Sequence, residues 1–180
     1  ISGTYADATF GGGGHTSEIL RRLSPEGRVI AFDRDLDAFA NKPDDSRLTL
    51  VRSDFRWIHN HILHLGHKDG IDGVLADLGV SSHQFDTAER GFSFRYDAPL
   101  DMRMNQEAEM TAEDIVNTYS QEDLENILRI YGEVDNSRKL AQLICRARET
   151  GQIRTTADLG NAIGSALPKF AEHKFLAKVY

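Results

Sequence analysis

Short apolar runs alternate with amphipathic stretches along the first 80 or so residues of the chain. The apolar runs predict strands over 5–10, 29–33, 48–54 and 71–77, and the helical patterns between them cover about 17–23 and 58–65. Strands that alternate with helices are typical of βαβ units, whose strands form a parallel sheet. The pattern therefore predicts an α/β domain at the beginning of the chain.

After Pro99 the pattern changes to helices without strands. Three of them begin with residue pairs typical of capping boxes, namely Thr111 with Asp114, Ser120 with Asp123, and Thr155 with Asp158. Apolar positions recur every three to four residues, which predicts that these helices pack together or onto the sheet. We expect an α/β domain over 1–104, an all-helical insertion over 105–170, and the start of a return to the first domain over 171–180.

The connection between the first strand and the first helix contains four consecutive glycines at 11–14, followed by His15. Glycine has no Cβ and tolerates positive φ, so backbone N–H groups can approach a ligand at the end of the strand. About twenty residues later the second strand ends at Asp33, where a carboxylate is placed to accept both hydroxyls of a ribose. We interpret the pair as a Rossmann-like site for a nucleoside-containing cofactor; the alternative is an ordinary strand-to-helix turn.

The glycine spacing favours one cofactor over another. Dinucleotide-binding turns follow Gly-x-Gly-x-x-Gly, and the third glycine would fall on Thr16 or Ser17. A turn without the complete pyrophosphate cradle suits S-adenosylmethionine, which carries adenosine and an amino acid but no phosphate. The sequence therefore favours a methyltransferase over a nicotinamide-dependent oxidoreductase. A noncatalytic module that holds S-adenosylmethionine would share the same motifs.

Asp77 ends the fourth predicted strand, at the same sheet edge as the glycine turn. An exocyclic amine is a poor nucleophile because its lone pair is conjugated with the ring, so its methylation needs a nearby acceptor. Asp77 is placed to accept a hydrogen bond from such an amine and to present it to a methyl sulfonium. It could equally hold the cofactor, or cap the next turn.

A loop over 86–104 is dense in arginine, aromatic residues and acids. Phe92 and Phe94 are candidates for stacking on an unstacked base, and Arg90 and Arg103 are candidates for binding phosphates. The alternatives are core packing for the aromatic residues and pairing with nearby acids for the arginines. The loop is therefore a candidate substrate-binding segment.

Composition narrows the class of protein. The chain has 180 residues, of which 40% are hydrophobic, enough for one ordinary domain with a small subdomain. The single cysteine, Cys145, excludes an internal disulfide and indicates a reducing compartment. No apolar run has the length of a membrane span, and we expect a cytoplasmic protein with no membrane partner.

Charge and histidine content add two further expectations. The net charge of −7 argues against indiscriminate nucleic-acid binding, but basic residues gather within 136–148, where they could face phosphates or line a solvated helix face. Four histidines within 59–67 lie beside an apolar stripe, without the cysteine or carboxylate partners of a closed metal site. We expect a solvated helix face there and no metal.

Five motifs follow one another along the chain: Asp7-Ala-Thr-Phe-Gly-Gly-Gly-Gly-His-Thr16, Ala31-Phe-Asp-Arg-Asp35, Asp77-Leu-Gly-Val-Ser-Ser82, Glu89-Arg-Gly-Phe-Ser-Phe94 and Pro99-Leu-Asp-Met-Arg-Met104. Together they resemble the bacterial ribosomal RNA small-subunit (16S) cytosine-N4 methyltransferase family. Tyr131-Gly-Glu133 and Lys174-Phe-Leu-Ala-Lys-Val-Tyr180 also match, so the resemblance covers essentially the whole chain. It implies methyl transfer from S-adenosylmethionine to N4 of a cytosine in the decoding region of small-subunit ribosomal RNA.

The resemblance also implies site residues and a partner. By matching motif, the cofactor contacts are Gly13, Gly14, His15, Asp33, Phe55, Asp77 and Gln84. Phe55 suits packing beside adenine, whereas nothing in the residue pattern itself indicates Gln84. The Asp-Pro-Pro-Tyr type motif of many amino-methyltransferases is replaced by Asp77-Leu-Gly-Val, so Asp77 as the catalytic residue is a hypothesis.

The implied substrate is small-subunit ribosomal RNA in an assembled or assembling particle, with its target cytosine unstacked. Members of the family begin before Ile1 and continue beyond Tyr180. We therefore expect the chain to be part of a longer enzyme, with an incomplete sheet and one uncovered sheet edge.

Overall fold

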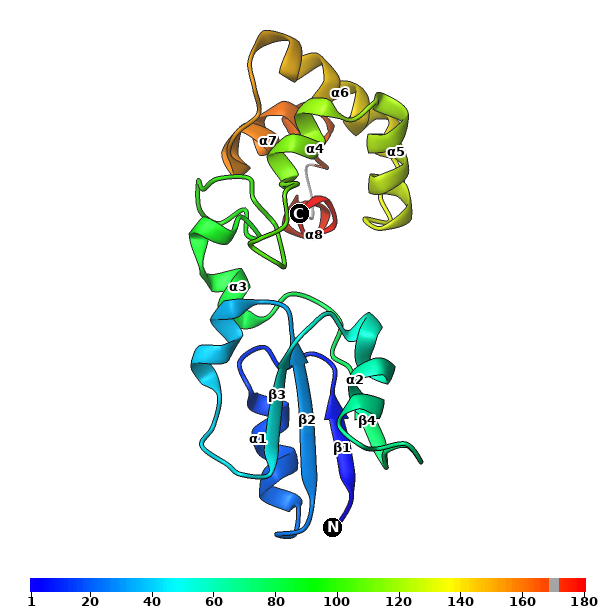
Figure 1. Cartoon of the computed structure of the whole chain (residues 1–180). Helices are drawn as coiled ribbons and strands as arrows, with labels where there is room; N and C mark the ends of the chain where they lie inside the picture. Colours follow the sequence, from blue (N-terminus) through cyan, green and yellow to red (C-terminus); the bar gives the residue numbers. More distant parts are fainter. Residues whose placement is uncertain (169–171) are drawn as a thin grey trace. The chain divides into compact units, whose positions relative to one another are not determined.

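Four parallel strands form a sheet in the first part of the chain (Figure 1). They are β1 (Thr4–Asp7), β2 (Arg28–Asp33), β3 (Leu48–Arg52) and β4 (Gly73–Leu75), in the spatial order β3-β2-β1-β4. Neighbouring strands are parallel, so their carboxyl ends lie along one edge of the sheet. The predicted α/β class is confirmed. The computed structural model describes residues 1–168 and 172–180.

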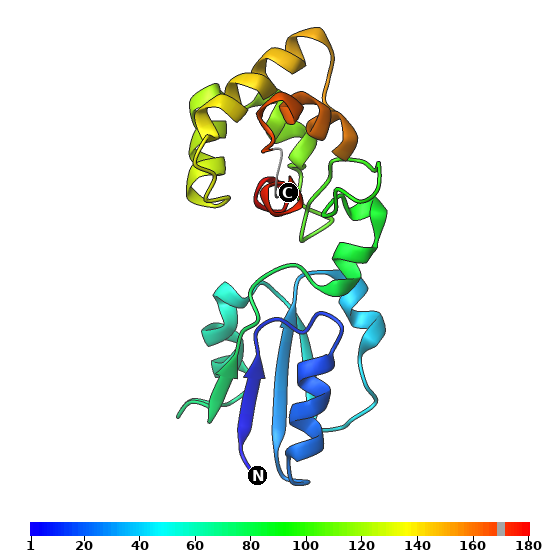
Figure 2. The same ribbon diagram turned by 180° about the vertical axis from the view of Figure 1, so that it is seen from behind.

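Both faces of this sheet are covered by helical segments (Figures 1 and 2). These segments are α1 (Gly14–Arg22), the 3-10 helices η1 (Leu36–Asn41) and η2 (Phe55–Trp57), and α2 (Ile58–His64). Successive side chains of a strand point to opposite faces of the sheet, and side chains of β2 are packed on both faces. Val29 and Ala31 pack in one cluster with Leu20 of α1, whereas Phe32 packs in another with Ile62 of α2.

The strand β4 is short and lies at the edge of the sheet. Val74, in the middle of the strand, is 61% exposed, and Leu78, just after the strand, is 68% exposed. Within the described residues the sheet ends at β4, and apolar side chains at and just after this strand are exposed.

The rest of the chain is helical. Its elements are α3 (Ser82–Asp86), η3 (Ala88–Arg90), α4 (Ala112–Thr118), α5 (Gln121–Ile130), α6 (Ser137–Thr150), α7 (Thr156–Ile163), η4 (Gly164–Ala166) and α8 (Glu172–Val179). The buried side chains of α5, α6 and α7, among them Leu128, Ile144 and Ile163, form one core. Thr111 and Thr155 form reciprocal capping boxes, and Ser120 accepts a hydrogen bond from the backbone N–H of Asp123. No helix in 1–168 or 172–180 is long and apolar enough to cross a membrane.

The chain divides into two packed units. Residues 1–83 and 104–106 form the sheet unit, and 84–103 and 107–180 form the helical unit. Pro99 forms a β-bridge with Thr155, and the N–H of Leu100 donates to the carbonyl of Arg154 at 2.9 Å. These contacts pack 84–103 with the helices, whereas the sequence groups 1–104 with the sheet.

The last helix, α8, packs within the helical unit. Leu176 of α8 is buried in the helical core, and the hydroxyl of Tyr180 donates to the carbonyl oxygen of Thr156. Within 172–180 the chain thus packs with the helices, whereas the sequence predicts the start of a return to the sheet domain. Recognition of RNA by residues 105–170 stays a prediction.

Gly91 has a backbone that other residues adopt at a cost, and its replacement tests the packing of the 84–103 segment. Its φ is 70°, and a Cβ there would lie 2.5 Å from the carbonyl oxygen of Pro99 and 2.8 Å from the backbone nitrogen of Asp101. We expect Gly91→Ala to lower the free energy of unfolding by about 2 kcal/mol or more. Urea unfolding followed by circular dichroism measures it. Gly151→Ala is the control, because a Cβ at Gly151 meets nothing within 4 Å. Equal losses for the two variants would contradict the prediction.

Candidate functional site

The glycine turn begins at the carboxyl end of β1 and runs into α1. Gly11 and Gly13 have φ of 52° and 77°, and Gly13 is the N-cap of α1. A Cβ on Gly13 would lie 2.9 Å from Cζ of Phe10, so this position is restricted to glycine. A Cβ on Gly12 or Gly14 would meet nothing within 4 Å. The backbone of the turn is therefore open to the close approach of a ligand.

Asp33 binds this turn directly. Its Oδ2 accepts a hydrogen bond from the N–H of Gly11 at 2.8 Å, and its Oδ1 accepts one from the N–H of Asp35 at 2.8 Å. A carboxylate oxygen has lone pairs for a second hydrogen bond. Asp33 therefore ties the end of β2 to the glycine turn and keeps acceptor capacity for two ribose hydroxyls.

Asp77 follows β4 and lies close to the turn on both sides, at Thr9 before it and at His15 after it. Its backbone N–H donates to Oγ1 of Thr9 at 2.8 Å, and its Oδ2 lies 4.0 Å from Nδ1 of His15. The side chains of His15 and Asp77 are 55% and 72% exposed. The fold thus brings His15, Asp33 and Asp77 to one glycine turn, with the Asp77 carboxylate accessible to a ligand.

Phe55 follows β3, the strand next to β2. It is the first residue of η2, its side chain is 43% exposed, and Asp54 caps the turn by accepting a hydrogen bond from the N–H of Arg56 at 3.0 Å. Partial burial raises the pKa of Asp54, but the hydrogen bond from Arg56 and the charges of Arg56 and Arg34 outweigh it and lower that pKa. An exposed aromatic ring is therefore presented on an anchored turn. Its contact with adenine stays a prediction.

Gln84 lies in α3 and is buried. It packs with the helical unit. Its place among the cofactor contacts rests on the motif resemblance and stays a prediction.

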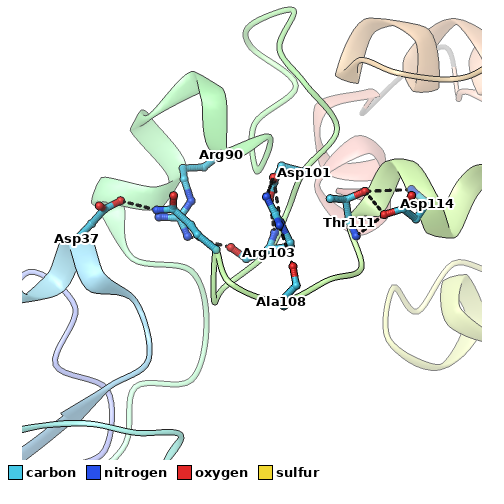
Figure 3. A network of polar contacts seen from close by, with 8 residues as sticks. Asp37, Arg90, Asp101, Arg103, Ala108, Thr111 and Asp114 are labelled. Carbon is cyan, nitrogen blue, oxygen red and sulfur yellow. Dashed lines mark hydrogen bonds and ion pairs between the residues drawn. The ribbon is translucent and has the colours of Figure 1, made fainter.

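The arginines predicted to bind substrate hold the loop in this structure (Figure 3). Arg103 forms a bidentate ion pair with Asp101, with a shortest N–O distance of 2.6 Å, and donates through Nη1 to the carbonyl of Ala108 at 2.8 Å. Arg90 is buried and donates through Nη2 to the carbonyl of Arg103 at 2.9 Å. Partial burial raises the pKa of Asp101, but the hydrogen bonds from Arg103 outweigh it and lower that pKa. Contact of Arg90 and Arg103 with phosphates stays a prediction.

The two predicted stacking residues are packed within the helical unit. Phe92 is buried, with the guanidinium of Arg90 5.9 Å from its ring centre. Phe94 lies against His173 and Tyr180, with ring centres 5.7 Å apart in both pairs. This arrangement favours the core-packing interpretation of both rings, and stacking on a base stays a prediction.

Sequence reasoning gave no role to Asp7, which is fully buried at the end of β1. Its Oδ2 accepts a hydrogen bond from Oγ1 of Thr16 at 2.7 Å, and its Oδ1 accepts one from the N–H of Thr9 at 3.1 Å. The available signal was a carboxylate inside an apolar strand, which is rare without a structural partner. Asp7 therefore belongs to the framework of the turn.

The capping carboxylates of the helical unit predict a pH dependence of its stability. Hydrogen bonds from the N–H groups of Arg154 and Thr155 lower the pKa of Asp158 below its ordinary value of 3.8, and Thr111 does the same for Asp114. Because both pKa values are lower in the folded state, their stabilisation is complete above the unfolded value and is lost as pH falls through 3.8 toward the folded values.

We therefore expect the free energy of unfolding to fall between about pH 5 and pH 3, and Asp158→Asn to reduce that slope. Urea unfolding at a series of pH values measures it. Asp135→Asn, at an exposed aspartate between α5 and α6, is the control. A slope that Asp158→Asn leaves unchanged would contradict the assignment.

Comparisons with known proteins give the relatives of this chain. The model of the MraW methylase family matches residues 1–180. The chain is 52% identical over 178 residues to a protein of Parabacteroides distasonis named ribosomal RNA small subunit methyltransferase H. Proteins with the same name from Phocaeicola vulgatus and Flavobacterium johnsoniae are 53% and 49% identical over 178 residues. Each alignment covers 99% of this chain and 58% or 59% of the relative, so the chain spans a little over half the length of these proteins.

Proposed function

The chain belongs to the MraW methylase family, and from that premise we propose that it carries the cofactor site of an enzyme that methylates ribosomal RNA. The methyl donor is S-adenosylmethionine, and the acceptor is the exocyclic N4 amine of a cytosine in the decoding region of small-subunit (16S) ribosomal RNA. One observation carries the proposal: at one edge of a parallel sheet, an open glycine turn is hydrogen-bonded to Asp33, and Thr9, just before the turn, is hydrogen-bonded to Asp77. The relatives' names support the RNA substrate, and the motif resemblance supports the base and the atom.

The residues of the turn suit the separate parts of S-adenosylmethionine, which supplies an electrophilic methyl group on a sulfonium when bound. Gly13, Gly14 and His15 lie where the backbone and an imidazole can approach the amino-acid portion, while the N–H of Gly13 itself donates to the carbonyl of Phe10 at 2.8 Å. Asp33 accepts the ribose hydroxyls while it keeps its hydrogen bonds from the N–H groups of Gly11 and Asp35. Phe55 packs beside the adenine through its exposed ring.

Asp77 acts on the nucleophile. Its exposed carboxylate accepts a hydrogen bond from the N4 amine, which orients the nitrogen lone pair toward the methyl group. As the new N–C bond forms, the electron pair of the broken S–C bond stays on sulfur. The amine then loses one proton, which the Asp77 carboxylate is placed to accept. Asp77 is thus proposed as both a cofactor contact and the catalytic acceptor.

The target cytosine has to leave its stack before its amine reaches this edge of the sheet. An assembled or assembling small-subunit particle can present such a base in a fixed conformation. We therefore propose the particle, rather than isolated RNA, as the substrate of a cytoplasmic enzyme.

Transfer of a labelled methyl group tests the proposal. The full-length protein is incubated with labelled S-adenosylmethionine and either small-subunit particles or naked small-subunit RNA, both lacking the modification, and nuclease digestion identifies the nucleoside. We expect N4-methylcytosine, formed faster on particles. Cofactor binding without labelled RNA on either substrate would contradict an enzymatic role, and preference for a nicotinamide cofactor would overturn the cofactor assignment.

A further inference from the structure

Asp7 holds two different segments of the candidate site. Thr16, which is also fully buried, donates its hydroxyl to Oδ2 of Asp7 at 2.7 Å and so fixes the first turn of α1 beside His15. The N–H of Thr9 donates to the other carboxylate oxygen at 3.1 Å. A buried carboxylate is costly unless it is hydrogen-bonded, so these two partners determine where the turn can lie.

Thr9 in turn holds the backbone of Asp77 by a hydrogen bond. The β1–β4 pairing ends with Asp7 opposite Leu75, followed by a hydrogen bond from the N–H of Ala8 to the carbonyl of Leu75 at 2.8 Å. Beyond this point the Oγ1 of Thr9 accepts a hydrogen bond from the backbone N–H of Asp77 at 2.8 Å. In a regular ladder a backbone carbonyl would accept this hydrogen bond. The side chain of Thr9 thus extends the pairing past the end of the three-residue strand β4.

We propose that Thr9 is a positioning residue that acts through Asp77, with Asp7 as the buried anchor of both sides of the site. The carboxylate of Asp77 and the imidazole of His15 come from different elements and lie 4.0 Å apart. Their backbones are held through the same aspartate, by Thr9 on one side and by Thr16 on the other. The inference rests on the proposed function, because it assigns to Thr9 the task of orienting the acceptor for the methyl-transfer step.

The test is a double-mutant cycle in the full-length protein, with single-turnover methyl transfer to small-subunit particles as readout. Thr9→Val removes the hydroxyl and keeps the branched shape, whereas Thr9→Ser keeps the hydroxyl. We expect Thr9→Val to slow transfer about tenfold and Thr9→Ser to restore the rate to within about threefold of the original. In an Asp77→Ala background, Thr9→Val should change the rate by less than about twofold, because the group it positions is gone.

Controls separate this role from general stability. Thr49→Val, at an exposed threonine of β3, makes the same chemical change in the same sheet and should leave the rate unchanged. If Thr9→Val slows transfer by the same factor with and without Asp77, Thr9 is merely structural and the inference is overturned. Failure of Thr9→Ser to rescue the rate would also overturn it.

Failure of the proposed function has a different signature, because the unmutated protein would then transfer no methyl group. The same cycle is in that case measured on the affinity for S-adenosylmethionine, which Asp77 is also proposed to contact. Additive losses of affinity would again contradict positioning through Asp77, and a loss confined to the protein that retains Asp77 would support it.

Discussion

Replacing Asp33 by Ala is expected to weaken binding of S-adenosylmethionine by about 100-fold, because two charge-assisted hydrogen bonds to the ribose are lost together. The same change removes the acceptor of the Gly11 N–H and loosens the glycine turn. Isothermal titration of the full-length protein measures the affinity. Asp44→Ala makes the same change at an exposed aspartate before β3 and should leave it unaltered.

A ligand without the ribose hydroxyls separates the two contributions of Asp33. A 2′,3′-dideoxy analogue of the cofactor should bind the unmutated protein more weakly than S-adenosylmethionine, and should bind Asp33→Ala about as well as S-adenosylmethionine does. If the analogue and the natural cofactor still differ on Asp33→Ala as they do on the unmutated protein, Asp33 acts only on the turn. That outcome would contradict its role at the ribose.

The strands were predictable because each is a short apolar run, but of their carboxyl ends only that of β2, at Asp33, was predicted correctly. The first strand was predicted to reach Phe10, and β1 ends at Asp7. Residues after it still bond to neighbouring strands, since the N–H of Phe10 donates to the carbonyl of Phe32 at 2.9 Å. The first helix begins at Gly14, earlier than predicted, because its N-cap is Gly13 in the left-handed region. A glycine N-cap carries none of the side-chain signals by which helix starts are recognised.

The site was predictable to the extent that it depends on strand ends. Asp33 and Asp77 follow apolar runs, and a parallel sheet brings such residues to one edge. The hydrogen bond between Thr9 and Asp77 joins residues 68 positions apart and depends on which strands are neighbours, information that no local pattern contains. Phe94 illustrates the same limit, because its packing partners His173 and Tyr180 lie at the far end of the chain.

Asp77→Ala is expected to slow methyl transfer by about 100-fold or more at saturating cofactor, because an acceptor for the amine proton is lost. Asp77→Asn keeps an acceptor oxygen but not the negative charge. Its rate of methyl transfer should therefore lie between those of the unmutated protein and Asp77→Ala. Single-turnover rates at saturating S-adenosylmethionine measure the chemical step, and titration measures cofactor affinity separately. Asp69→Ala, at an exposed aspartate in the connection before β4, is the matched control.

The two measurements distinguish the two roles proposed for Asp77. A lower affinity with an unchanged single-turnover rate would make it a cofactor contact alone, and the amine would then lose its proton to water. A lower rate with unchanged affinity would make it the catalytic acceptor alone. We expect both to change, with the larger effect on the rate, because the Asp77 side chain is 72% exposed at the edge where we propose that the substrate base arrives.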